Sequence, residues 1–155
     1  MKNQLIIQKL MDLNITFGSV ESFTGGQFAS TVVNYPGVSK VYKGSIVSYS
    51  NDVKHRVLKI KESDLKKYGA VSSTVALEMA RNGKKLLDVD FCVAFTGNAG
   101  PTATNYDVGE VFIALIYGED EILEHFKIKG DRNKVRSEAV TRAFQILERV
   151  LENYN

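Results

Sequence analysis

One run of apolar residues constrains the fold of this chain more than any other segment. From Asp90 to Phe95 the sequence reads Asp-Phe-Cys-Val-Ala-Phe, and turn-forming residues follow it. A strand that is apolar at every position has both faces buried, which is typical of a largely parallel sheet covered by helices on both sides. A second run, 15–20, reads as another short buried strand. These two segments therefore predict central strands of a layered α/β protein.

Helical and strand patterns alternate along most of the chain. The helical patterns are 3–13 (with Ile6, Leu10 and Leu13 on one apolar stripe), 27–34, a short segment beginning near 51, 61–67, 73–87, and about twenty residues from 130. The strand patterns are 15–20, 43–50, 90–95, 108–117 and 122–128, the last two forming an antiparallel hairpin. We therefore predict one domain over residues 1–155: α/β, a three-layer α/β/α sandwich on a mixed, mostly parallel sheet.

Composition excludes several classes of function. The chain has 20 basic and 18 acidic residues, and a net charge of +2 gives no electrostatic case for nucleic acid or an anionic membrane. No segment has the pattern of a signal peptide or a membrane span, so we expect a cytoplasmic protein. The single cysteine, Cys92, lies in the apolar run and is expected to be buried. With His55 and His125 it makes no metal-ligand spacing, so we expect no metal and no cofactor.

The first buried strand runs into the turn Glu21-Ser22-Phe23-Thr24-Gly25-Gly26, after which a helix is predicted. Glycines let the backbone bend sharply and approach a ligand closely, and the start of a helix offers N–H groups to an anion. Two roles are open for the hydroxyl of Ser22 or Thr24: it acts as a nucleophile, or it caps the helix. These six residues alone leave both open.

A second turn of the same kind, Thr96-Gly97-Asn98-Ala99-Gly100-Pro101, follows the strand at 90–95. In open α/β sheets, ligands bind outside the carboxyl ends of the strands. If the two strands are parallel neighbours, the two turns face each other across one crevice. Neither turn fits the P-loop or the dinucleotide fingerprint.

A serine nucleophile in this crevice would need a base, and a histidine is not expected to supply it. His55 lies between two basic residues on a helix that should be exposed, and His125 lies in the hairpin. The other option is a lysine with a lowered pKa, here Lys54, working directly or through Tyr49. The alternative reading, a solvated lysine on a helix face, is the commoner fate of a lysine.

Two arginines begin the last helix. Arg132 and Arg136 are four residues apart and therefore lie on one side of it. They would hold a phosphate or carboxylate group of a ligand, or they would pair with acidic neighbours. The sequence leaves both alternatives open.

Taken together, these motifs resemble the CinA C-terminal domain family, which includes the nicotinamide-nucleotide amidases. The resemblance runs through nearly the whole chain. It is carried by six blocks in order: Glu21–Gly26, Tyr35-Pro36-Gly37, Tyr49-Ser50-Asn51 with Lys54, Gly69-Ala70-Val71-Ser72, Thr96–Pro101, and Gly130-Asp131-Arg132 with Val135-Arg136.

The resemblance implies a reaction of pyridine nucleotide salvage: hydrolysis of the carboxamide of nicotinamide mononucleotide to nicotinate mononucleotide and ammonia. It implies Ser22 as the nucleophile and Lys54, with Tyr49, as its proton acceptor. The partner is then a small-molecule nucleotide substrate. The residues expected to bind it, through side chains or backbone N–H groups, are Thr24, Gly25, Gly26, Thr96, Gly97, Asn98, Gly100, Thr102 and Arg132.

The chain departs from the family pattern at three places in the predicted crevice. Phe23 stands where a small residue is usual, Asn98 stands where isoleucine is usual, and the loop 102–107 lacks the usual glycines. These changes bear on substrate identity more than on fold. They keep an alternative open, a non-catalytic nucleotide- or protein-binding relative. The chain also resembles the stand-alone form of the domain.

The sequence leaves two alternatives open for the oligomeric state. The apolar hairpin segment 111–116 is either an edge strand that pairs with a second subunit, which would give a homo-oligomer, or an edge covered within the chain.

Overall fold

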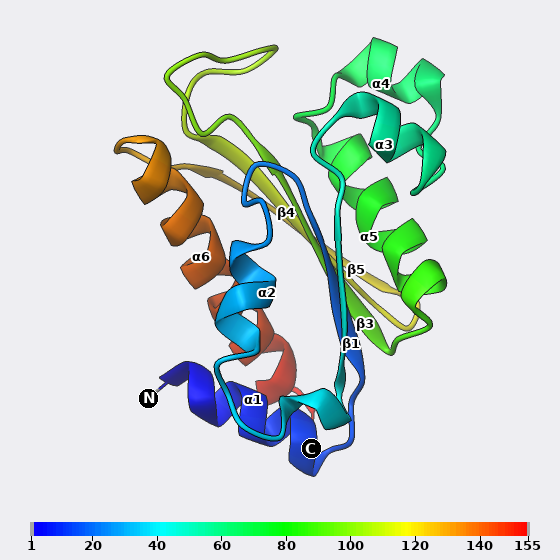
Figure 1. Ribbon diagram of the computed structural model, residues 1–155, viewed down its shortest axis with the longest axis vertical. Coiled ribbons are helices and arrows are strands. Elements are labelled where there is room, and N and C mark those ends of the chain that lie inside the picture. The colour runs from blue at the N-terminus through cyan, green and yellow to red at the C-terminus, as the bar shows by residue number, and fades with distance from the viewer. Residues whose placement is uncertain (1, 155) are drawn as a thin grey trace.

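The computed structural model describes residues 2–154 and contains one five-stranded sheet (Figure 1). The strand order is β2-β1-β3-β4-β5. The strands are β1 (Phe17–Glu21), β2 (Tyr42–Val47), β3 (Phe91–Gly97), β4 (Glu110–Tyr117) and β5 (Asp120–Lys127). Strand β1 pairs in parallel with both β2 and β3, whereas β4 is antiparallel to β3 and to β5. The sheet is therefore mixed with a parallel core, as predicted.

Helices cover both faces of this sheet (Figure 1). Helices α1 (Lys2–Asp12), α2 (Gln27–Val32) and α6 (Arg132–Glu152) lie on one face. The other face carries α5 (Ser73–Leu87), with the shorter α3 (Asn51–Arg56) and α4 (Glu62–Tyr68) beside it. A short 3-10 helix, η1, spans Val38–Lys40. The three-layer α/β/α sandwich is confirmed. Within residues 2–154 no helix combines the length and the apolar character needed to cross a membrane.

Some boundaries differ from the sequence prediction for local reasons. Strand β2 ends at Val47 rather than at Ser50, because the Ser50 hydroxyl caps α3 by accepting a hydrogen bond from the Val53 amide at 3.2 Å. The first helix ends at Asp12, so the prediction that Leu13 belongs to its apolar stripe is wrong. Leu13 is 43% exposed, and Ile7 is buried instead.

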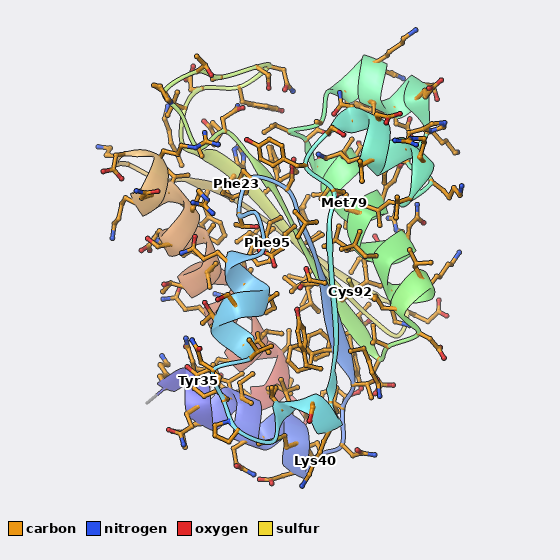
Figure 2. All side chains as sticks on the ribbon, viewed as in Figure 1. Phe23, Tyr35, Lys40, Met79, Cys92 and Phe95 are labelled. Atoms are coloured by element: carbon orange, nitrogen blue, oxygen red, sulfur yellow. The ribbon has the colours of Figure 1, made fainter. Side chains whose placement is uncertain are left out.

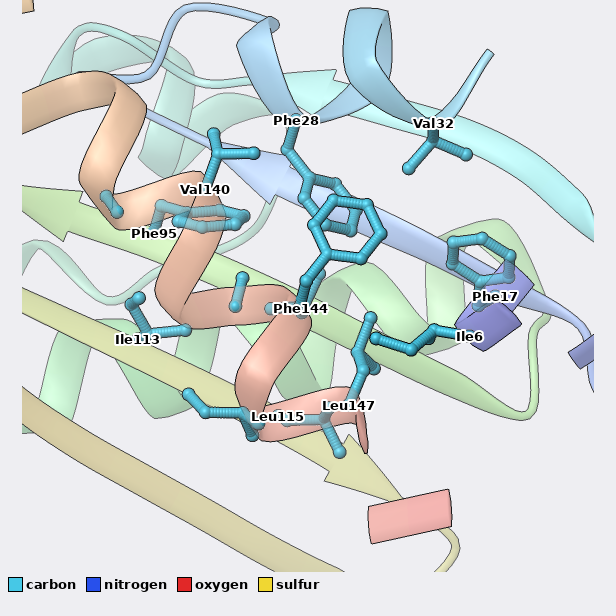
Figure 3. Close-up of a cluster of buried hydrophobic side chains, with 14 of the residues drawn as sticks. Ile6, Phe17, Phe28, Val32, Phe95, Ile113, Leu115, Val140, Phe144 and Leu147 are labelled. Carbon is cyan, nitrogen blue, oxygen red and sulfur yellow. The ribbon is translucent and has the colours of Figure 1, made fainter. Parts of the chain in front are cut away.

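The core has two parts, one on each face of the sheet. Under α2 and α6, the rings of Phe28, Phe95 and Phe144 meet with centroids 5.3–5.4 Å apart (Figure 3). Under α5, Met79 and Cys92 are fully buried and lie between the helix and the sheet (Figure 2). Because side chains of a strand alternate between faces, neighbouring residues of β3 contribute to different parts of the core.

The hairpin is formed as predicted, and its position shows whether the apolar segment 111–116 is an edge of the sheet. Residues 111–116 lie in β4 and are buried, because β5 pairs with β4 along its whole length. The apolar strand is therefore covered within the chain. The outer strand β5 alternates exposed and half-buried side chains instead.

Candidate active site

The carboxyl ends of three parallel strands meet at one edge of the sheet, since β1 lies between β2 and β3. The two predicted turns follow β1 and β3 and face each other there. A cavity of about 470 Å³ opens at this edge, a size typical of small-molecule sites. The predicted site residues that line it are Ser22, Tyr49, Lys54, Thr96, Gly97, Asn98, Thr102 and Arg132; Thr24, Gly25, Gly26 and Gly100 do not.

Ser22 and Lys54 are in direct contact inside this cavity. The Lys54 Nζ lies 2.9 Å from the Ser22 Oγ, 2.7 Å from the Ser48 carbonyl oxygen and 3.2 Å from the Tyr49 carbonyl oxygen. Helix α3 begins directly after β2, and this short connection brings Lys54 to the end of β1. The lysine is 1% exposed, so the alternative reading of a solvated side chain is wrong.

Burial changes the acid–base properties of this lysine. Loss of hydration disfavours the charged ammonium and lowers the pKa of Lys54 from 10.5 to about 8. Its three contacts are two carbonyl groups and a hydroxyl, none of which carries a charge that would restore the pKa. A large part of this amine is therefore neutral at a pH near 8.

Tyr49 contributes two different groups to the site. Its backbone carbonyl accepts a hydrogen bond from Lys54, whereas its side chain is 61% exposed and turns toward α6. There the Tyr49 hydroxyl accepts a hydrogen bond from Arg132 Nη2 at 3.0 Å. The contact between Ser22 and Lys54 thus needs no bridging hydroxyl.

Neither Ser22 nor Thr24 caps helix α2, because Glu21 does. Its buried carboxylate accepts hydrogen bonds from the amides of Gly26, Phe28 and Ala29 at 3.0–3.1 Å, and from the Ser45 hydroxyl at 3.2 Å. The expectation that this helix start offers its N–H groups to an anionic ligand is therefore wrong: a carboxylate of the chain itself already occupies it.

The turn after Glu21 is held by Arg136. Its Nε donates to the Phe23 carbonyl and its Nη2 to the Thr24 carbonyl, both at 3.0 Å. Gly25 and Gly26 follow with φ of 60° and 99°, which side chains other than glycine rarely adopt. Within residues 2–154, the amides of Phe23 and Thr24 have no hydrogen-bond acceptor, and neither has the buried Thr24 hydroxyl.

The second turn forms the opposite wall of the cavity. Thr96 donates from its hydroxyl to the Ala70 carbonyl at 2.7 Å. A Cβ at Gly97 would lie 2.9 Å from the Glu110 carbonyl oxygen and 3.1 Å from the Phe23 ring, so glycine makes room for both β4 and this phenylalanine. Phe23 is 5% exposed, lines the cavity and also packs into the core (Figure 2).

The cavity is electropositive at the end away from Ser22. Arg132 donates to the Gly100 carbonyl at 2.7 Å as well as to Tyr49, and Arg136 donates to carbonyls only. The alternative in which these two arginines pair with acidic neighbours is therefore wrong for the residues that the structure describes. Arg132 carries a permanent positive charge there, and the lining residues include no carboxylate from residues 2–154. An anionic group of a ligand fits this end.

Sequence reasoning missed the roles of Glu21 and Arg136, and it missed Asn105 altogether. Glu21 and Arg136 belong to motifs that the sequence singles out, but their partners lie 5 to 113 positions away. Asn105, which also lines the cavity, donates to two carbonyls of another segment and has no local signal at all.

Comparison with known proteins supports one family. The family model described as "CinA C-terminal domain" matches residues 2–151. The CinA-like proteins of Thermosipho melanesiensis and Thermotoga maritima are each 39% identical over 96% of this chain. The chain spans 37% of the length of each of these relatives.

Solved structures agree with this assignment. The competence-damaged protein (CinA) superfamily protein from Escherichia coli is 28% identical with a TM-score of 0.93, covering 97% of this chain and 88% of its own. The competence/damage inducible protein CihA from Agrobacterium tumefaciens is 29% identical with a TM-score of 0.90, covering 94% and 91%. From the family match, the relatives and the shared fold, we conclude that the chain belongs to the CinA C-terminal domain family.

Proposed function

We propose that this site hydrolyses the carboxamide of nicotinamide mononucleotide, yielding nicotinate mononucleotide and ammonia. The observation that carries the proposal is the 2.9 Å contact between the Ser22 hydroxyl and a buried lysine amine whose pKa is lowered to about 8. A serine becomes a useful nucleophile when an adjacent base accepts its proton. Lys54 supplies that base.

When Lys54 is neutral, its contacts turn the amine lone pair toward Ser22. A neutral amine has two N–H donors and one lone pair. The carbonyls of Ser48 and Tyr49 accept the two N–H groups, so the lone pair faces the Ser22 hydroxyl. In the first step the Ser22 Oγ bonds to the amide carbon while its proton passes to Lys54.

The intermediate formed in this step carries negative charge on the former carbonyl oxygen. The amides of Phe23 and Thr24, which have no acceptor within residues 2–154, are suited to donate to it. The other predicted donors of this turn are less suitable, because the Gly25 amide donates to the Ser22 carbonyl and the Gly26 amide to Glu21.

Collapse of the intermediate breaks the C–N bond. Lys54 returns the proton to the departing nitrogen, ammonia leaves, and the nicotinate group remains as an ester of Ser22. Water then attacks this ester, and Lys54 accepts a proton from the water. The second collapse breaks the ester bond and restores Ser22, so that one amide and one water give one carboxylic acid and one ammonia.

The nucleotide part of the substrate supplies the anion that the other end of the cavity suits. Arg132, with its fork between Gly100 and Tyr49, is the proposed phosphate ligand, and Thr102 lines the same region. Family membership and the resemblance in motifs support this substrate over another amide.

The test is ammonia release from nicotinamide mononucleotide by the purified chain, with EDTA present and no metal added. We expect turnover, and we expect Ser22→Ala to lower it by a factor of about 10³ or more. Ser30→Ala, an exposed serine on α2, is the matched control and should leave the rate unchanged. Turnover that persists in Ser22→Ala contradicts the nucleophile assignment. Nucleotide binding without turnover in the unmutated protein supports the alternative, a non-catalytic relative.

A further inference from the structure

Residues 98–109 join β3 to β4, and the segment 98–107 of this connection forms one wall of the cavity. It lies at the same end of the molecule as α3 and α4 (Figure 1). Thr102, Thr104 and Asn105 of this segment line the cavity opposite α3, which carries Lys54. The segment contains no helix or strand. Backbone hydrogen bonds hold its base, where Asn98 donates to Glu110 and accepts from Gly109, and side-chain contacts hold the rest.

Asn98 ties the two ends of this segment together. Its Nδ2 donates to the Tyr106 carbonyl at 3.0 Å and to the Asp107 carbonyl at 3.5 Å. Its Oδ1 accepts from the Thr104 amide and lies 3.3 Å from the Thr104 hydroxyl. This side chain, 6% exposed, therefore connects the middle of the loop to its end, above the backbone hydrogen bonds that Asn98 makes at the base.

Asn105 ties the same loop to the other side of the cavity. Its Nδ2 donates to the Tyr68 carbonyl at 3.0 Å and to the Val71 carbonyl at 2.9 Å, in the connection between α4 and α5. A Cβ at Gly69 would lie only 2.7 Å from this amide, so glycine at that position gives Asn105 its room. The Thr104 hydroxyl lies 3.1 Å from the Asn105 Oδ1 and 3.3 Å from the Asn98 Oδ1, and it can donate its one proton to either.

A third contact holds the end of the loop against the sheet. The Tyr106 ring packs edge-on against Phe112 and His125, with centroids 5.4 and 6.0 Å apart. The loop is thus attached at its base, at the α4–α5 connection and at the sheet. Three attachments at different points favour a fixed wall over a freely moving loop.

We infer that Asn98 and Asn105 are positioning residues that hold segment 102–107 as a preformed wall, and that this wall limits the size of molecules that reach Ser22 and Lys54. The inference deepens the proposed function, since it concerns the same cavity. Its consequence is selectivity: a small acyl compound, or a nucleotide whose shape fits the cavity, reaches the dyad with the wall in place, whereas a bulky compound of another shape, such as a biotin ester, reaches it only when the wall opens.

The test measures access to Lys54 with two acylating reagents and does not require turnover. The N-hydroxysuccinimide esters of acetate and of biotin each transfer their acyl group to a neutral amine and release N-hydroxysuccinimide. Mass spectrometry of peptides gives the rate at Lys54, with the exposed Lys40 as internal reference because it lies far from the cavity (Figure 2). The quantity compared is the ratio of the biotin rate to the acetate rate.

Two substitutions remove the attachments without changing side-chain size much. Asn105→Asp puts a carboxylate oxygen against the Tyr68 and Val71 carbonyls. Asn98→Leu removes the side-chain hydrogen bonds of Asn98 to Thr104, Tyr106 and Asp107 and keeps its backbone hydrogen bonds. We expect the ratio at Lys54 to rise about tenfold in each, as the loss of two ordinary hydrogen bonds would allow. Chymotrypsin cleavage after Tyr106 should accelerate in parallel. Asn34→Ala, an exposed asparagine outside the cavity, is the matched control.

Each outcome decides the inference. A raised ratio with faster cleavage supports it, whereas an unchanged ratio overturns it whether or not cleavage accelerates. Thermal unfolding checks that the variants fold. If Asn105→Asp does not fold, Asn105→Ala replaces it, because alanine removes the hydrogen bonds without adding a buried charge. If the proposed function is wrong, the unmutated chain releases no ammonia. The labelling ratio can still be measured in that case, because it does not require turnover.

Discussion

At the scale of single residues, the chemistry of this site depends on the charge of one amine. Lys54 is almost fully buried, and its contacts are neutral oxygen atoms. Desolvation therefore lowers its pKa without an opposing ion pair. Only the neutral amine can accept a proton from Ser22, so the fraction of active protein depends on pH.

This dependence predicts the pH profile of the proposed amidase. Below the Lys54 pKa of about 8 the amine is protonated, so kcat/KM should fall about tenfold per pH unit and level off above pH 8. Lys54→Arg should be inactive across the range, because a guanidinium is not deprotonated. The exposed Lys66→Arg is the control and should keep the profile of the unmutated chain. A flat profile from pH 6 to 9 would contradict the role of Lys54.

The same pKa shift predicts how stability changes with pH. The folded-state pKa of Lys54 is about 8 and the ordinary value is 10.5, so the unfolded chain binds more protons between these values. The free energy of unfolding should therefore rise with pH through this window, by up to about 3 kcal/mol from this group. Urea denaturation of the unmutated chain and of Lys54→Met at pH 7, 9 and 10.5 measures it. As pH rises, the free energy of unfolding of the unmutated chain should increase relative to that of Lys54→Met. An unchanged difference between the two would contradict the lowered pKa of Lys54.

At the scale of elements, the active turn is held by two charged side chains that contact its backbone. Glu21 accepts three amides at the start of α2, and Arg136 donates to two carbonyls of the preceding turn. In a planar peptide the N–H group points away from the carbonyl, so a carbonyl that faces Arg136 directs its N–H group away from the arginine. The Phe23 carbonyl shares a planar peptide with the Thr24 N–H, so the contact with Arg136 sets the orientation of that N–H group.

Glu21→Gln tests the contribution of the helix cap. A glutamine keeps one acceptor oxygen but turns an NH₂ group toward backbone donors, so buried amides lose their partner. We expect the free energy of unfolding to fall by about 2–4 kcal/mol, since hydrogen bonds to a buried charge are stronger than neutral ones. Chemical denaturation measures the loss. Glu62→Gln, whose side chain is 74% exposed, should change stability by less than about 0.5 kcal/mol.

Arg136→Lys tests the orientation of the turn. Lysine keeps the charge but has no planar fork, so it cannot donate to both carbonyls in the same geometry. We expect ammonia release to fall by a factor of about 10², the usual effect of a displacement near 1 Å at a reacting group. Arg142→Lys on the same helix, where the arginine pairs with Glu138, is the control for helix stability. If Arg136→Lys and Arg142→Lys lose the same activity, the contacts of Arg136 with the turn have no specific role in catalysis.

At the scale of the whole molecule, the three layers meet at close contacts that only small residues allow. Gly83 lies in the middle of α5 and is buried against the sheet. A Cβ at this position would lie 2.3 Å from Val20 Cγ2 and 3.0 Å from Cys92 Sγ. The distance between α5 and the sheet is therefore set here, and α5 in turn supports the α4–α5 connection that Asn105 contacts.

Gly83→Ala should therefore destabilise the protein, although alanine favours a helix by about 1 kcal/mol over glycine. Overpacking against Val20 should outweigh that gain and lower the free energy of unfolding by about 1–3 kcal/mol. Val20→Ala removes the methyl group that clashes, so the double variant should lose less than the sum of the two single changes. A double-mutant cycle by urea denaturation measures the coupling, and strict additivity would refute the close contact.

Much of the fold was predictable because its signals are local. Ser72 and Asp131 cap α5 and α6 through amides three residues away, and apolar periodicity marks the strands and helices between the caps. The pairing of Ser22 with Lys54 was predictable in part, because each follows a strand that ends at the same edge of the sheet. The roles of Glu21 and Arg136 were not, since a sequence does not state which carbonyl or amide a distant charged group will reach.

The sequence by itself determined the layered α/β architecture and the two turns that carry the site, because hydrophobic periodicity, caps and glycines act within a few residues. Tertiary structure alone decided the chemistry of the site. Burial of Lys54 lowers its pKa, a carboxylate of the chain occupies the helix start that seemed open to an anion, and Asn105 fixes a wall against a segment 34 to 37 residues earlier. Desolvation and long-range hydrogen bonds depend on where chain segments meet, and that information exists only once the chain has folded.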